Sequence, residues 1–131
     1  MSGKISILIY SQQELLFNIL DKQRRPFHDL MLFPVWQAQS AILFLNDPEM
    51  YPLILVADES ADIQALKTTL LSLKHHGKAV FAIHTGSFSS KQLAMSFSCG
   101  FDEFLATSVS LKQIIQFASR KASQITVKTS I

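Results

Sequence analysis

Short apolar runs that have no polar side recur along this chain of 131 residues, and they limit the folds that it can adopt. The clearest run is "LILVA" (Leu53–Ala57), which follows a proline and precedes two acidic residues. The run "ISILIY" (Ile5–Tyr10) is similarly rich in aliphatic residues. A strand without a polar side is typical of a parallel sheet that is covered on both faces. The sequence therefore predicts a sheet of this kind, with helices packed on both sides.

Each apolar run is followed by apolar residues three or four positions apart, as on one face of a helix. The predicted strands cover residues 5–10, 27–35, 53–57, 79–83 and 104–105, and the helices carry their apolar residues within 15–20, 38–45, 63–73, 93–97 and 111–118. Five strands that alternate with five helices predict a doubly wound α/β fold. We expect the flavodoxin-like strand order 2-1-3-4-5, in which ligands lie over the carboxyl ends of the strands.

The same pattern predicts one domain over residues 1–123 and a linker or frayed end over residues 124–131, where helical spacing is lost. The formal net charge of +2 and the single small basic cluster near residues 22–25 argue against a nucleic-acid partner. The chain has one cysteine, Cys99, and its apolar runs are far shorter than the roughly 20 residues that span a bilayer. These features predict a cytoplasmic protein with no disulfide and no membrane segment.

Residues 100–115 carry a more specific pattern. Gly100 is followed by two acids, by the aromatic residue Phe104, by a short strand and by a helix that Ser110 can cap. With the predicted strand order, this pattern resembles a response-regulator receiver (CheY-like) domain over Ile5 to about Ser123. The resemblance implies a signalling module that is not an enzyme and acts through contacts with protein partners.

The resemblance also implies a phosphorylation site, and the predicted magnesium and acceptor positions of this site have changed. A working receiver needs an acidic pair after its first strand, because Mg²⁺ prefers carboxylate oxygens. The matching positions here are Ser11 and Gln12, which carry no charge. We align the phosphoacceptor position, at the end of the third strand, with Ala57. Asp58 then lies one residue later, on the other side of the strand.

The remaining two positions of the receiver site differ as well. The hydroxyl expected at the end of the fourth strand is matched by His84, with Thr85 one residue behind it. The lysine and proline expected after the fifth strand are replaced by Thr107 and Ser108. Without the lysine and the acidic pair, a transferring phosphoryl group would lack charge stabilisation.

We therefore interpret the chain as a degenerate pseudo-receiver that needs no phosphorylation, metal or cofactor. Two alternatives stay open: an atypical receiver that is phosphorylated on Asp58, and a flavodoxin-like protein that binds a nucleotide or a flavin. The acids Asp58, Glu59 and Asp62 are interpreted as the solvated N-terminus of a helix, where negative charge complements the helix dipole.

The resemblance also indicates where a protein partner would bind. In receivers the fourth helix, fifth strand and fifth helix form the usual output and dimer face. The candidates for its centre in this chain are Met95, Phe104, Gln113 and Phe117, which could equally belong to the edge of the core. We expect a protein partner at this face, either another protein or a second copy of the chain.

Overall fold

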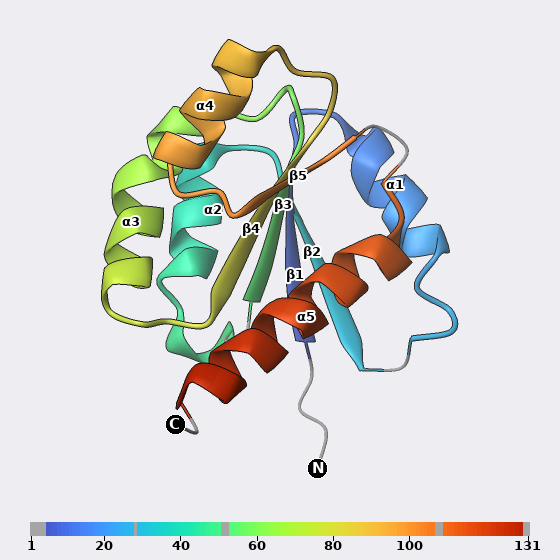
Figure 1. Ribbon diagram of the computed structural model, residues 1–131. Helices are drawn as coiled ribbons and strands as arrows, with labels where there is room; N and C mark the ends of the chain where they lie inside the picture. Colours follow the sequence, from blue (N-terminus) through green and yellow to red (C-terminus); the bar gives the residue numbers. More distant parts are fainter. Residues whose placement is uncertain (1–4, 28, 51–52, 107–108, 130–131) are drawn as a thin grey trace.

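The computed structural model describes residues 5–27, 29–50, 53–106 and 109–129, and side chains within these ranges up to residue 120 apart from that of Met50. Five parallel strands form one sheet in the predicted order β2-β1-β3-β4-β5 (Figure 1). The strands are β1 (Ile5–Tyr10), β2 (Leu30–Val35), β3 (Leu53–Ala57), β4 (Val80–Thr85) and β5 (Glu103–Leu105). The α-helices of the described ranges are α1 (Glu14–Lys22), α2 (Ala38–Leu45), α3 (Lys67–His75), α4 (Ser90–Ser98) and α5 (Leu111–Thr129). Two 3-10 helices, η1 (Pro48–Met50) and η2 (Gln64–Leu66), precede β3 and α3.

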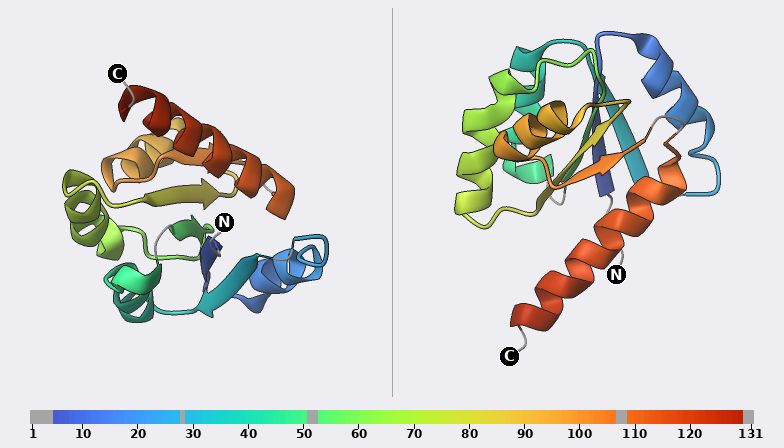
Figure 2. Two further views of the ribbon diagram at one scale, coloured as in Figure 1. Left: turned by 90° about the horizontal axis from the view of Figure 1, so that it is seen from below. Right: turned by 45° about the horizontal axis from the view of Figure 1, so that its top comes forward.

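The sheet separates two cores. Helices α2, α3 and α4 cover one face of the sheet, and α1 and α5 cover the other (Figures 1 and 2). Successive side chains of a strand point to opposite faces. In β3, Leu55 and Ala57 therefore pack on the α2/α3 side, whereas Ile54 and Val56 pack on the α1/α5 side. This double burial explains why the run has no polar side, as the sequence predicted.

Asp102 connects the start of β5 to α3 and β4. Its carboxylate forms a salt bridge with the Lys74 ammonium of α3, with an N–O distance of 2.6 Å. The same carboxylate accepts a hydrogen bond of 2.8 Å from the Ala82 amide of β4. These two contacts set the position of the short edge strand.

The last helix is longer than the sequence predicted. Helix α5 ends at Thr129, so that residues 124–129, expected as a linker or frayed end, are helical. The sequence-based boundary followed the apolar spacing, which fades after Ala118. No glycine or proline follows Leu111, so nothing in the backbone chemistry ends the helix there. The right-hand view of Figure 2 shows the C-terminal part of α5 extending past the sheet.

We predict that Ala57→Asp destabilises the fold, because Ala57 is 0% exposed and lies in the core beneath α2 and α3. A buried carboxylate without a partner should lower the free energy of unfolding by about 3–5 kcal/mol. Urea unfolding at pH 7 measures this change. The control is Ala65→Asp on η2, where the side chain is exposed and the midpoint should hardly move. An unchanged midpoint for Ala57→Asp would contradict the prediction.

Candidate functional site

Three polar residues lie at the carboxyl ends of the central strands, on the α1/α5 face of the sheet. Ser11 directly follows β1, Asp58 directly follows β3, and Thr85 is the last residue of β4. Each continues the series of side chains that lines the core beneath α1 and α5. The preceding members of the three series are Ile9, Val56 and Ile83. The register of β3 with β4 pairs Ala57 with His84 and so places Asp58 level with Thr85.

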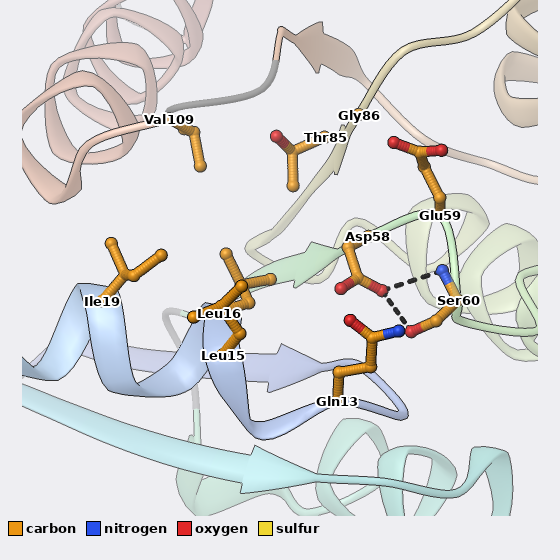
Figure 3. Close-up of a pocket in the computed structure, with 10 residues that line it drawn as sticks. All are labelled: Gln13, Leu15, Leu16, Ile19, Asp58, Glu59, Ser60, Thr85, Gly86 and Val109. Carbon is orange, nitrogen blue, oxygen red and sulfur yellow. Dashed lines mark hydrogen bonds between the residues drawn. The ribbon is translucent and has the colours of Figure 1, made fainter.

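Hydroxyl and amide groups surround the Asp58 carboxylate. The Ser11 hydroxyl donates to Oδ2 of Asp58 at 2.6 Å, and the Ser60 hydroxyl donates to Oδ1 at 2.6 Å. The Ser60 amide donates to the same Oδ1 at 3.0 Å, as Figure 3 shows. The backbone amide of Gln12 donates in turn to the Ser60 hydroxyl at 2.8 Å. These neutral donors hold the carboxylate at the end of β3.

A cavity of about 590 Å³ lies beside this carboxylate, between α1 and the loops that follow β3, β4 and β5. Its lining is polar at one end and apolar at the other (Figure 3). The lining residues are Gln13, Leu15, Leu16, Ile19, Asp58, Glu59, Ser60, Thr85, Gly86 and Val109. Sequence reasoning missed the apolar end. The available signal was the number of apolar residues at positions 15–20, which is more than one helix face can bury.

Glu59 connects the loop after β3 to the loop after β4. Its carboxylate oxygen Oε1 accepts a hydrogen bond of 3.0 Å from the Ser87 amide. The Glu59 side chain lies over Gly86, where an added Cβ would be only 2.3 Å from Cγ of Glu59. Gly86 also has a φ of 150°, which side chains disfavour. A glycine is therefore required at residue 86 while Glu59 keeps this position.

Thr85 faces the neighbouring loop instead of Asp58. Its side chain is buried, with 4% exposed, and its hydroxyl donates to the Ala106 carbonyl at 3.4 Å. The Gly86 amide donates to the Leu105 carbonyl at 3.2 Å. Both hydrogen bonds join the end of β4 to β5 and the residue that follows it.

His84 lies on the opposite face of the sheet, beneath α4, and is 4% exposed. Its Nδ1 is 3.0 Å from the Ser96 hydroxyl, and its Nε2 is 3.3 Å from the Asp58 carbonyl. The ring packs against Phe88 and Phe101, with centroid distances of 4.2 and 5.2 Å. Burial lowers the pKa of His84 below its ordinary value of 6.5, although the Asp58 carbonyl and the charges of Asp58 and Glu59 act in the opposite direction.

The sequence-based alignment of the site needs correction at two strands. It placed Ala57 and His84 in the pocket, whereas both side chains lie on the other face of the sheet. Asp58 and Thr85, each one residue later, line the cavity. A shift of one residue exchanges the two faces of a strand, so this small error moved both positions to the wrong side.

The remaining predicted site residues belong to the end of β1 and to the segment after β5. Ser11 lies beside Asp58, whereas the Gln12 side chain is exposed and only its backbone amide takes part. Thr107 and Ser108 lie outside the described residues. Among the residues that are described, no group of three or more histidine, cysteine, aspartate or glutamate side chains could hold a metal ion.

The candidates for a partner face lie in different environments. Met95 on α4 is 37% exposed, Gln113 on α5 is exposed, and Phe104 on β5 is partly buried. Phe117 is only 4% exposed and belongs to the core beneath α1 and α5. For Phe117 the alternative of a position at the edge of the core is therefore the one that the burial supports. Phe117 is therefore not accessible to a partner.

No protein-family model and no curated protein matches the sequence. Among solved structures, the chain is similar to the signal receiver domain of a LuxO repressor protein from Vibrio parahaemolyticus. The TM-score is 0.71 at 15% identity, over 95% of this chain and 96% of that chain. The chain has the receiver fold.

Two further structures with this fold come from different settings. One is a pilus assembly protein from Burkholderia thailandensis, with a TM-score of 0.66 and 16% identity over 91% of this chain and 98% of that chain. The other is the receiver domain of Saccharomyces cerevisiae Ssk1, solved with the histidine phosphotransfer protein Ypd1. Its TM-score is 0.69 at 17% identity, over 91% of this chain and 89% of that chain. At these identities the likeness establishes the fold alone.

None of the helices in the described ranges combines the length and the apolar character that crossing a bilayer requires.

We predict that His84 makes the stability of the protein depend on pH. Because its pKa is lower in the folded state than in the unfolded state, the folded state binds fewer protons. The free energy of unfolding should be highest above pH 6.5 and should fall as the pH decreases toward the pKa of the folded protein. Urea titrations between about pH 7.5 and 5 measure this dependence.

The variant His84→Asn should lose this pH-dependent contribution, because asparagine does not titrate in the range. The control variant, His75→Gln combined with His76→Gln, changes two exposed side chains and should keep the slope of the parent. An identical slope for His84→Asn and the parent would contradict the assignment to His84.

Proposed function

We propose that this chain is a signalling module with the receiver fold that binds a protein partner without magnesium-dependent phosphorylation of Asp58. The observation that supports this proposal is the chemistry around the Asp58 carboxylate. Its hydrogen-bond donors are the hydroxyls of Ser11 and Ser60 and one backbone amide, all of which are neutral. Phosphoryl transfer instead depends on cations that neutralise the charge of the transferring group.

The charge at this end of the sheet also disfavours a phosphoryl group. Asp58 and Glu59 both line the cavity, and Ser11, Gln12 and Gln13, which directly follow β1, add no carboxylate that could complete a magnesium site. A phosphate placed next to two carboxylates, without a metal ion between them, would be repelled. The same repulsion argues against a nucleotide or flavin phosphate in this cavity.

Aromatic contacts favour a partner face that keeps one conformation. The ring of Phe104 on β5 packs against Phe88 at a centroid distance of 5.4 Å, and Phe88 packs against His84. This series supports Phe104 from the inside, through contacts that reach the backbone carbonyl of Asp58 but not its carboxylate. The side chain of Gln113 accepts a hydrogen bond from the Ser110 amide and caps α5, which shapes the same face.

We therefore place the partner surface on α4, β5 and α5, with Met95, Phe104 and Gln113 as its candidates. The simplest partner is a second copy of the chain. In the complex with Ypd1, the Ssk1 receiver domain is bound to another protein, which is the kind of contact proposed here. The proposal differs in requiring no phosphorylation before binding.

We predict that Mg²⁺ with acetyl phosphate, or with beryllofluoride, leaves the protein unchanged. Intact-mass spectra should contain no phosphorylated species, and the amide spectrum should not shift. A phosphorylated species that is present in the parent and lost in Asp58→Asn would contradict the proposal and favour an atypical receiver. Marked thermal stabilisation by FMN or ATP would instead indicate a nucleotide-binding protein.

We predict that Met95→Glu weakens self-association at the α4-β5-α5 face, because a charge would be buried at the contact. If Met95 is central to the contact, the loss of about 1–3 kcal/mol corresponds to an increase of roughly 5- to 150-fold in the dissociation constant. Sedimentation equilibrium measures this constant.

The matched control is Leu43→Glu on α2, which makes the same kind of change on a residue that is 74% exposed. Circular dichroism should first show that both variants are folded, and Leu43→Glu should then associate like the parent. A protein that is monomeric at every concentration, or equal effects of the two variants, would contradict the proposed dimer face.

A further inference from the structure

The cavity at the carboxyl end of the sheet continues into an exposed apolar surface on α1. Leu15 is 63% exposed and Ile19 is 41% exposed, and both line the cavity. They are four residues apart, so they lie on the same face of the helix. Val109, which precedes α5, forms the opposite wall (Figure 3). We name the combination of this cavity and the α1 surface the α1 groove.

The other end of the α1 groove is negatively charged. Asp58 and Glu59 line it together, and neither forms a salt bridge with a cation among the described residues. The salt bridges of the described part of the chain join Arg24 to Asp21 and Lys74 to Asp102, away from the groove. The hydrogen-bond donors to Asp58 are neutral, so its charge is not compensated locally. A positive charge from outside would be attracted to this end.

One kind of side chain fits both ends of the α1 groove. Lysine and arginine have an apolar stem that packs along hydrophobic surface and a cationic head that stays near polar groups. With its head at Asp58 and Glu59, the stem of such a side chain would lie toward Leu16 and Val109. Leu15 and Ile19, farther along α1, would then face aliphatic neighbours of the cation on the partner.

We propose that the α1 groove binds a lysine or arginine side chain of a partner protein, carried on a helix whose aliphatic residues cover Leu15 and Ile19. The partner would supply in trans the positive charge that the described residues do not provide beside Asp58. This inference rests on the proposed function, since a groove that holds a partner side chain is not free for phosphoryl transfer. It concerns a surface separate from the α4-β5-α5 face.

A pair of peptides tests the inference on the full chain. The first is a blocked, fluorescently labelled helical peptide with leucines three and four residues apart and one central lysine. The second is identical except that the lysine is acetylated, which removes the charge and keeps the stem. We expect the lysine peptide to bind at least about tenfold more tightly by fluorescence anisotropy, and to shift the amide signals of Leu16, Ser60 and Gly86. Added salt should reduce this difference.

Matched variants locate the binding. Glu59→Gln keeps an acceptor for the Ser87 amide and removes the charge, and Leu15→Ser removes exposed apolar surface. Each variant should lower the affinity for the lysine peptide by about fivefold or more. The controls Glu49→Gln and Leu43→Ser change exposed residues of the same types elsewhere and should bind like the parent.

Four results would overturn the inference: binding of neither peptide, equal binding of both, saturable shifts of the same amides by Mg²⁺ alone, and loss of self-association in Ile19→Glu. The third result would identify a metal site, and the fourth would identify a second copy as the occupant. Phosphorylation of Asp58 is measured separately. It would refute the proposed function and would leave the comparison of the two peptides as an independent result.

Discussion

The alternation of side chains along the central strand β3 is the constraint on which the other features depend. Because the strand is covered on both faces, each residue is assigned to one core or the other by its position alone. Leu55 and Ala57 support α2 and α3, whereas Ile54 and Val56 support α1 and α5. Asp58, the first residue beyond the strand, continues this alternation onto the α1/α5 side and therefore faces the cavity.

The fold was predictable because its signals are distributed over many residues. Five apolar runs and the helical spacing between them indicate the class, and the strand order is the usual one for five such units. An error of two residues at a boundary changes neither. The site was less predictable because it depends on which residue at each strand end has its side chain on the cavity face, and this alternates from one residue to the next. Counting alternate residues back from Asp58 through Val56 and Ile54 identifies its face, whereas an alignment to the receiver pattern placed Ala57 there. The spacing of Phe117 from Ile114 likewise matches the buried stripe of α5.

Other features had no local signal in the sequence. Ser60 is 2 positions from Asp58 in the sequence, but Ser11 is 47 positions away. Only the sheet register brings all three residues together. The cavity arises between α1 and a loop near Val109, which the sequence does not relate to each other. The contact of Glu59 with Gly86 is also tertiary. Such sites follow from the assembled backbone and not from any one segment.

The close contact between Glu59 and Gly86 has a consequence for how this part of the chain can change over evolution. A side chain at residue 86 would occupy the space that Glu59 now fills, and without Glu59 the Ser87 amide would lose its carboxylate acceptor. The two positions are therefore constrained as a pair. Among relatives that keep a glutamate at position 59, position 86 should stay glycine, because the occupied space and the φ of 150° both disfavour a side chain there.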